Sequence, residues 1–380
     1  MTEFVFWQYC LSMHQSAFLR NLAVHHPVTL LVSKEWAENR KNLGWEKPNL
    51  DGVRVIISPN DEVIQEVFTT KANAIHSFGG IDAFPFVYKA FKLAVKKKVN
   101  ITVHLEPLNL DGVKGKIRIL KYWIIKLRYG RYIDAILVKG FLGRACYEKV
   151  GFSKEKIWDW AYFTEDHDKT GVDLSDSGAA KLPSFLFVGA LIDRKNILPI
   201  LKDAIPLASG IEKFSVIGTG PLEKEIQQIA DNHQKIHFLG KKSNREVNAL
   251  MSAHDYLVLP SLFDGWGAVV NEALMAGTRV IVSNKSGAAS LLLDETRGYV
   301  FNINGSPDFS QVFKKAIHAG PTSPERRKTI QDWAHKRISG HQGAEYFKRI
   351  VKYIYGKEAS RPIAPWLKGE VMPSDIIKNV

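Results

Sequence analysis

Short apolar runs alternate with helical patterns along the first half of the chain, and this alternation limits the possible folds more than any other feature. The apolar runs lie at 4–7, 29–32, 53–57, 74–75, 101–103 and 135–138. Helical patterns separate most of them, among others at 15–24, 61–70 and 84–98. Strands that alternate with helices form parallel sheets with helices on both faces, so we expect an α/β domain.

The same alternation restarts after a polar, acidic stretch. Further strands are predicted at 185–188, 214–217, 236–239 and 256–259, with helices at 196–204 and 222–233. At 380 residues the chain is long enough for two domains. We therefore predict a first domain over 1–165, a linker over 166–181 and a second doubly wound domain over 182–355.

The stretch 254–293 combines a strand, a glycine-containing loop, a helix and a second strand. The loop 263–267 leads into a helical pattern that ends at Gly277. Asp264 in the loop and Glu272 in the helix are eight positions apart. Backbone amides at a helix N-terminus bind anions. Two carboxylates beside such amides suit a ligand with phosphates at one end and hydroxyl groups around them, such as a nucleotide sugar.

This stretch, with Asp264-Gly265-Trp266-Gly267 followed by Glu272-Ala273-Leu274-Met275-Ala276-Gly277, resembles the retaining family-4, or group 1, glycosyltransferases. The hallmark of that family is Glu-x7-Glu, and here Asp264 stands at the first position. The resemblance implies the GT-B fold, in which two Rossmann-like doubly wound domains face each other across a cleft. It also implies that a C-terminal segment, here 356–380, returns to the first domain.

The resemblance further implies transfer of a sugar, with retention at the anomeric carbon, from a nucleotide-sugar donor such as a UDP- or GDP-sugar. The acceptor would be a glycan or a lipid-linked molecule in a bacterial surface-polysaccharide pathway. Glu272 would accept hydrogen bonds from ribose hydroxyls. Asp264 would hold the transferred sugar and stabilise positive charge that develops on it.

The donor-binding residues are predicted in loops of the second domain. Arg194 and Lys195 follow a strand and precede a helix, where two cations oppose the helix dipole unless an anion binds. In the family, a lysine that matches Lys195 contacts the donor diphosphate, and turns like those after the next two strands lie beside the nucleotide. The predicted donor-binding residues are Gly189, Arg194, Lys195, Gly218, Gly220, Lys241, Gly265, Trp266, Gly267, Ala268, Val269 and Glu272.

The first domain supplies one predicted catalytic residue and two acceptor-side residues. His104 ends a predicted strand, and ligands bind at the carboxyl ends of parallel strands. Family members carry a similar Thr-x-His whose histidine touches the donor sugar, so His104 joins Asp264 and Glu272 as a predicted catalytic residue. Glu106 and His14 are candidates for the acceptor side.

No cofactor and no metal are expected. Asp166 and Asp168 form an Asp-x-Asp, but in a linker rather than after a strand, and no Cys/His cluster has zinc spacing. Two cysteines, no apolar run long enough for a bilayer and no basic signal-peptide region predict a cytoplasmic protein.

The net charge of +13 calls for an anionic partner. Residues 114–132 contain seven Lys or Arg and no acid. In a helix, Ile117, Leu120, Ile124 and Leu127 form an apolar stripe beside a basic one. That composition favours a helix lying on an anionic membrane, which predicts a peripheral protein on the inner face of the cytoplasmic membrane.

Two other functions fit parts of the pattern. A non-catalytic nucleotide-sugar or polyanion-binding protein of the same fold is one, because Asp264 departs from the family and the first loop, 8–15, lacks the Gly-Gly that many members have. A nucleic-acid-binding protein is the other. Only the charge motivates it, no nucleic-acid motif is present, and we expect no nucleic-acid partner.

Overall fold

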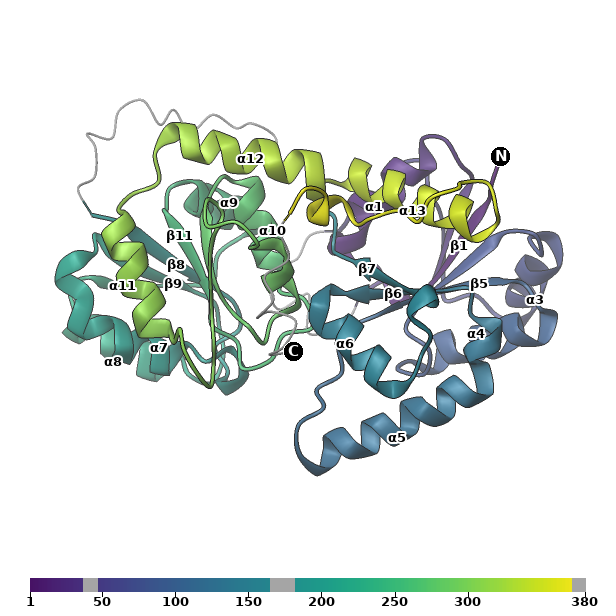
Figure 1. Ribbon diagram of the computed structural model, residues 1–380, viewed down its shortest axis with the longest axis horizontal. Helices are drawn as coiled ribbons and strands as arrows, with labels where there is room; N and C mark the ends of the chain where they lie inside the picture. Colours follow the sequence, from purple (N-terminus) through teal and green to yellow (C-terminus); the bar gives the residue numbers. More distant parts are fainter. Residues whose placement is uncertain (37–46, 165–181, 371–380) are drawn as a thin grey trace.

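The computed structural model describes residues 1–36, 47–164 and 182–370, and it contains two parallel sheets side by side (Figure 1). The first sheet has the order β3-β2-β1-β4-β5-β6-β7. Its strands are β1 (Phe4–Cys10), β2 (Val28–Lys34), β3 (Arg54–Ile57), β4 (Ile75–Gly79), β5 (Asn100–Leu105), β6 (Ala135–Lys139) and β7 (Ile157–Trp160). The predicted linker 166–181 lies outside the described residues.

Helices cover both faces of this sheet because side chains alternate between the faces along each strand. In β1, Phe4 and Phe6 pack on one face, and Val5 and Trp7 on the other. The first face is covered by α1 (Met13–Ala23) and α13 (Gly340–Ile354). The second face is covered by α3 (Asp61–Thr70), α4 (Pro85–Lys97), α5 (Gly112–Tyr129) and α6 (Gly140–Val150).

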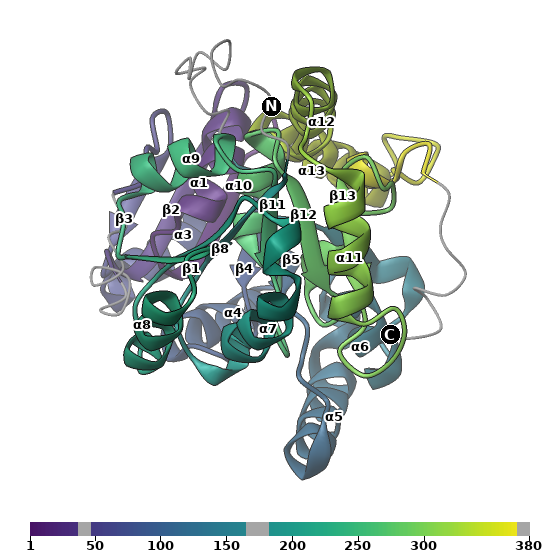
Figure 2. The same ribbon diagram turned by 90° about the vertical axis from the view of Figure 1, so that its left-hand side faces the viewer.

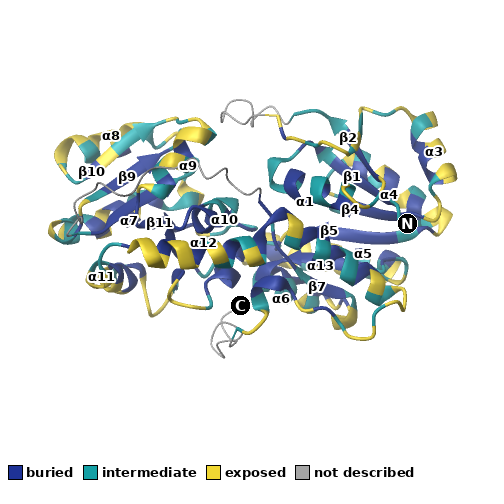
Figure 3. Cartoon of the chain, turned by 90° about the horizontal axis from the view of Figure 1, so that it is seen from above, coloured by how far each residue is buried: buried dark blue, intermediate teal, exposed yellow. Residues whose placement is uncertain are grey.

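The second sheet has the order β10-β9-β8-β11-β12-β13. Its strands are β8 (Ser184–Val188), β9 (Lys213–Ile217), β10 (Ile236–Gly240), β11 (Tyr256–Leu259), β12 (Arg279–Ser283) and β13 (Gly298–Phe301). One face packs on α7 (Ile197–Ala204), α8 (Glu223–Asn232) and α11 (Phe309–Ala319), and the other on α9 (Asn244–Ser252), α10 (Ala268–Met275) and α12 (Pro324–Ile338). The strands of both sheets are largely buried (Figure 3). The predicted α/β fold with two Rossmann-like sheets is confirmed.

The chain crosses between the two sheets at two points that lie against each other. Thr164, after β7, accepts a hydrogen bond from Gly340 N at 3.0 Å, and its own N–H donates to Ile338 O at 3.3 Å. After the second crossing, α13 packs on α1. A Cβ on Gly340 would stand 2.6 Å from the backbone of Ala17. Residues 340–355 were predicted in the second domain, but they pack on the first sheet because their apolar face meets Phe4, Phe6 and Phe18.

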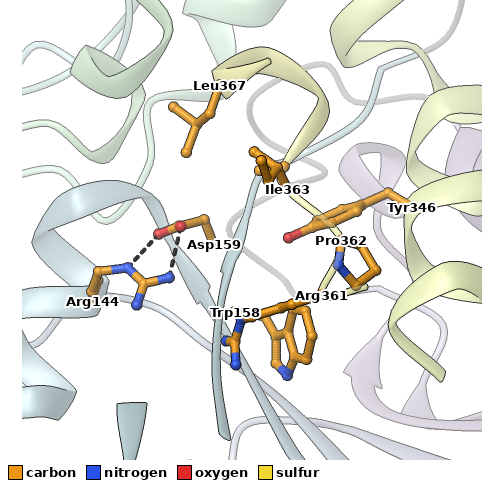
Figure 4. A pocket seen from close by; sticks show the side chains of 9 residues that line it. Arg144, Trp158, Asp159, Tyr346, Arg361, Pro362, Ile363 and Leu367 are labelled. Atoms are coloured by element: carbon orange, nitrogen blue, oxygen red, sulfur yellow. Dashed lines mark hydrogen bonds and ion pairs between the residues drawn. The ribbon is translucent and has the colours of Figure 1, made fainter. Parts of the chain in front are cut away.

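The residues after α13 first run along the first sheet, and the last described ones contact the second domain, where Arg337 donates to Pro365 O at 3.0 Å and Arg297 pairs with Glu370 at 3.0 Å. The guanidinium of Arg361 lies 3.9 Å from the ring centre of Trp158 in β7 and donates to the carbonyl of Ile157. Arg144 of α6 holds Asp159 with two hydrogen bonds of 2.9 and 2.7 Å in the small pocket beside this segment (Figure 4). Because Arg144 and Asp159 are paired with each other, we assign this pocket a structural role.

Candidate functional site

The carboxyl ends of β8 and β9 carry two loops whose backbones are in direct contact. Leu191 N donates to Thr219 O at 2.8 Å, and Gly189 N donates to Ile217 O at 3.0 Å. A Cβ at Gly218 would stand 1.8 Å from Gly189 O, and one at Gly220 would stand 2.4 Å from Leu191 O. Both glycines also have positive φ, 149° and 156°. Only glycine fits there, so these two predicted site residues shape the loop at the sheet edge.

An acid and two basic residues meet at the same edge. Lys195 Nζ donates to Asp264 Oδ2 at 2.6 Å, and the two side chains are 15% and 14% exposed. Arg194 Nη1 donates to Phe263 O at 2.7 Å and lies 3.9 Å from the same carboxylate oxygen. The structure thus joins two loops that are 69 positions apart in the sequence. The cations stand where the sequence predicted a diphosphate, and Lys241 follows the end of β10 at this edge.

The loop from Asp264 leads directly into α10. Gly267, with φ of 91°, precedes the first helical residue, and Ala268 and Val269 are partly exposed in the first turn. Trp266 is 1% exposed and donates from Nε1 to Asn271 Oδ1 at 2.7 Å. Its ring therefore supports the loop from within the core. The donor-binding prediction for Trp266 concerned the backbone amides of residues 265–268, and the buried ring leaves that part of the prediction open to test.

Glu272 lies one turn into α10 and keeps part of its surface exposed. The surrounding protein desolvates the carboxyl group and raises its pKa to about 7. Among the residues that the structure describes, no side chain or backbone group forms a hydrogen bond with this carboxylate. An acid with a raised pKa and free acceptor oxygens is suited to bind hydroxyl groups.

The first half of the chain places three further side chains opposite the Asp264 loop. Glu106 follows β5, and a Cβ on Gly265 would stand 2.6 Å from its Oε2. Tyr162 donates from its hydroxyl to Glu106 Oε1 at 2.6 Å. The ring of His14, in α1, lies 5.1 Å from that of Tyr162. The two predicted acceptor-side residues, Glu106 and His14, are thus brought together by Tyr162, which the sequence prediction did not include.

Lys139 is a second residue that sequence reasoning missed. It ends β6 with a side chain that is 2% exposed, and Nζ lies 3.5 Å from Ala161 O and 4.5 Å from the ring centre of Tyr162. Within the described ranges no carboxylate forms an ion pair with it. Burial lowers its pKa to about 7, against the opposing attraction of Glu106. A lysine at the end of an otherwise apolar run, 135–138, was the available signal in the sequence.

His104 lies near the carboxyl end of β5, as predicted, but its ring is buried. Its ring lies among those of Phe6, Phe18, Trp160 and Phe347, and it is 7% exposed. Nε2 is 2.9 Å from Ser77 Oγ, and burial, with Lys139 nearby, holds the pKa of the imidazole well below its usual range. Helix α13 covers this end of β5, so we assign His104 to the core rather than to contact with a sugar.

No group of three or more His, Cys, Asp or Glu side chains is arranged to hold a metal ion within 1–36, 47–164 and 182–370. Asp166 and Asp168 lie outside these ranges. In the same ranges, no helix combines the length and the apolar character that a membrane span requires. A cavity of about 440 Å³ lies between Phe141 and Leu142 of α6 and the segment that contains Ser286 and Gly287, and Gly287 N donates to Asp264 O at 3.2 Å.

The arrangement of two parallel α/β domains with candidate ligand groups on facing edges defines the GT-B class. The crystal structure of the Anabaena protein HepE in complex with UDP has this fold, with a TM-score of 0.68 and 13% identity over 93% of this chain and 100% of HepE. HepE has also been crystallised with UDP-glucose. The lipopolysaccharide outer core galactosyltransferase WaaB matches with a TM-score of 0.64 and 16% identity, over 94% of this chain and 100% of WaaB.

Residues 182–318 match the family model of group 1 glycosyl transferases. An uncharacterized glycosyltransferase of Methanocaldococcus jannaschii is 31% identical over 168 residues, which is 43% of each chain. The second half of the chain is thus similar to group 1 glycosyl transferases, in agreement with the resemblance that the sequence indicated. The matches span less than half the length of each of the first curated relatives.

Proposed function

We propose that this protein is a hexosyltransferase that moves a sugar from a nucleotide-sugar donor to a glycan or lipid-linked acceptor. The observation that carries the proposal is the joint position of Asp264, Lys195 and Glu272 at one sheet edge, with Glu106 of the other half against Gly265. Such a site has cations that can bind phosphates and carboxylates that can bind hydroxyl groups. The facing side, which carries Glu106, leaves a place for an acceptor.

The donor would bind along the second sheet. Lys195, Arg194 and the amides of residues 265–268 would stabilise the negative charge that develops on the leaving diphosphate, which is the electrostatic part of catalysis. In this structure Lys195 is held by Asp264, and a diphosphate would compete for that cation. Asp264 would then be released to face the transferred sugar. The UDP and UDP-glucose complexes of HepE support a UDP-sugar as the first donor to test.

The acceptor would bind along the first sheet, where Glu106, Tyr162 and His14 meet. Glu106 is exposed, and Tyr162 orients one of its carboxylate oxygens. Lys139, held beneath Tyr162, adds an amino group that pairs with no carboxylate in the described ranges. Such a group is suited to position an acceptor hydroxyl beside the sugar, and we infer that positioning role for Glu106 and Lys139.

We further propose that the anomeric configuration is retained and that no metal is needed. Both rest on the family resemblance and on the cations at the diphosphate position, which can do the work that a divalent ion does in other transferases. Activity should therefore survive EDTA. Activity that is lost with EDTA and restored by Mn²⁺ or Mg²⁺ would contradict this, and it would point to Asp166 and Asp168.

The test of the proposed function is a panel of UDP- and GDP-sugars, first by thermal shift and then by turnover with the donor that stabilises the protein most. A bound donor raises the melting temperature, and the rise grows with the logarithm of the ratio of its concentration to its dissociation constant. The proposal predicts that one donor raises it and is consumed. A donor that binds without transfer or hydrolysis would favour the non-catalytic binding protein. A panel without any binding would overturn the donor assignment.

The proposal includes a role in bacterial surface-polysaccharide biosynthesis at the inner face of the cytoplasmic membrane. The family resemblance supports it, and WaaB, which shares the fold, is named as a lipopolysaccharide transferase. Product analysis with lipid extracts as acceptors would test it.

A further inference from the structure

Helix α5 has an apolar face that no other part of the described chain covers. Its exposed large apolar residues range from 46% exposed for Trp123 to 74% for Val113. They are Val113, Ile117, Leu120, Trp123, Ile124 and Leu127. The helix protrudes at the lower edge of the molecule in two perpendicular views (Figures 1 and 2). We call Val113, Ile117, Leu120, Ile124 and Leu127 the ridge.

The ridge points away from the protein because the helix attaches through its opposite side. Gly115, Tyr122, Ile125 and Tyr129 are buried. At 100° per residue these four centre about half a turn from the ridge residues, which repeat three and four positions apart. Gly115 is needed at the attachment, since a Cβ there would stand 1.9 Å from Leu110 O. The exposed apolar stripe is thus a consequence of how α5 is anchored.

Basic residues flank the ridge on both sides, and α5 contains no acid. Lys114, Lys121 and Arg128 lie along one side of the ridge and Lys116 along the other, and all four are exposed. Of these, Lys121 is paired with an acid, Asp82, at 2.5 Å. An apolar stripe between two basic edges is complementary to a partner that has an anionic surface over an apolar interior.

The spacing of the ridge is also that of a coiled-coil seam, so a second copy of this chain must be considered. In a seam built on Ile117, Leu120, Ile124 and Leu127, the charged residues at flanking positions are Lys114, Lys116, Lys121 and Arg128, and Trp123 is a further flanking residue. Pairing two copies would set cation against cation at these positions, which normally carry opposite charges. The charge pattern therefore disfavours self-association and favours an anionic partner.

We propose that α5 is a membrane-insertion helix that lies in the headgroup region of an anionic bilayer with its ridge in the acyl boundary. Its 18 residues span about 27 Å, enough to lie along the surface. Trp123 at the side of the ridge suits the headgroup level. Glu106 lies in the short segment 106–111 that leads from β5 into α5. Contact of α5 with a membrane would therefore bring the proposed acceptor side close to the membrane. Only this last point, a membrane-borne acceptor, rests on the proposed transferase function.

The proposal separates two contributions that can be measured independently. The basic edges should act through charge and weaken with salt, because surface potentials are screened within about 10 Å at 0.1 M salt. The ridge should act through burial of apolar surface and persist at high salt. Co-sedimentation with vesicles of equal parts phosphatidylglycerol and phosphatidylcholine, and with phosphatidylcholine alone, reads out both.

Three variants make the experiment specific. Ile117→Gln, Leu120→Gln, Ile124→Gln and Leu127→Gln together remove the ridge but keep good helix formers. We expect vesicle partitioning to fall on the order of a hundredfold. Lys114→Gln with Lys116→Gln should reduce binding to anionic vesicles about tenfold at low salt. The matched control, Lys96→Gln with Lys97→Gln, removes two exposed charges at the end of α4 and should change binding less than twofold.

Several results would overturn the proposal. One is a parent protein that does not bind anionic vesicles at low salt, and another is a ridge variant that binds like the parent. A third is a Lys96→Gln, Lys97→Gln control that loses as much binding as the Lys114→Gln, Lys116→Gln variant. A parent that sediments as a dimer and a ridge variant that sediments as a monomer would assign the ridge to a second copy instead. Calorimetry with UDP on every variant keeps the outcomes separate, since donor binding should not change even if membrane binding fails.

Discussion

The two facing edges of the molecule are built in different ways. On the second sheet, the candidate donor groups sit in loops held by backbone contacts, as between Gly189 and Gly218 or Asp264 and Lys285. On the first sheet, the candidate acceptor groups are side chains held by one another, as in the contacts of Glu106, Tyr162 and Lys139. The family model matches only within the second half, over 182–318.

This difference shows what each edge demands of the sequence. A loop that must approach another backbone requires glycine at fixed positions, and such positions form a recognisable local pattern. A cluster of side chains from β5, β6, α1 and the segment after β7 can be assembled from many residue types. Recognition of a common donor thus leaves a local signature, whereas the opposite edge can vary without changing the fold.

The largest expected effect is that of Asp264→Asn on the donor edge. Turnover should fall about 10²–10³-fold, because a charge that stabilises the transition state is lost. UDP binding should stay the same or tighten, because Lys195 is released from its ion pair. Steady-state kinetics and calorimetry would test this together. Turnover near that of the parent would make Asp264 a turn residue that holds Lys195.

Glu272→Gln should act on binding of the nucleotide itself. Loss of a charged hydrogen-bond acceptor costs about 1.5–3 kcal/mol, which is roughly ten- to more than a hundredfold in UDP affinity. The pKa of about 7 adds a pH signature. In the parent, affinity should fall as the pH drops through 7, because the carboxylate becomes protonated. Glu272→Gln should lose that part of the pH dependence, and identical profiles for the two proteins would contradict the assignment.

Lys139→Met should separate stability from function on the acceptor edge. The pKa of Lys139 is lowered from 10.5 to about 7 by burial. Between those values the unfolded chain binds more protons than the folded one, so the parent gains stability as the pH rises. At pH 7 the parent loses stability because folding removes a proton from Lys139 or buries its charge. Lys139→Met avoids this cost and should be more stable than the parent at pH 7 by on the order of a few kcal/mol, and the difference should vanish toward pH 10.

The same variant should lower transfer to the acceptor about tenfold and leave UDP affinity unchanged, if Lys139 positions the acceptor. Melting curves across pH and acceptor titrations would measure both effects. A stabilised variant with full transfer would mean that Lys139 is buried without a functional role, and a destabilised one would mean that its cation is paired.

His104→Phe should have the smallest effect on catalysis. The ring is enclosed by aromatic side chains, and a phenyl ring of similar size can fill that space. Turnover should stay within a few-fold of the parent, while the melting temperature changes through loss of the contact with Ser77. A loss of turnover that matches Asp264→Asn would return His104 to the catalytic group.

Some of the site could be predicted because its signals are local. The alternation of strands and helices, the end of α10 at Gly277 and the pair of acids within one loop and helix all lie within short windows of sequence. Residues such as Tyr162 and Lys139 could not be found in this way. Tyr162 lies 56 positions from Glu106, and nothing near either residue in the sequence indicates that they meet.

By itself, the sequence determined the fold class, the second-half loops and the existence of an apolar stripe beside a basic one in α5. Periodicity and glycine positions act over a few residues, so they can be seen without coordinates. Only the tertiary structure decided which side of α5 is anchored, that His104 is covered by α13 and that Glu106 lies against Gly265. Each of these depends on packing between distant segments, because burial is a property of the assembled core and not of any one stretch of chain.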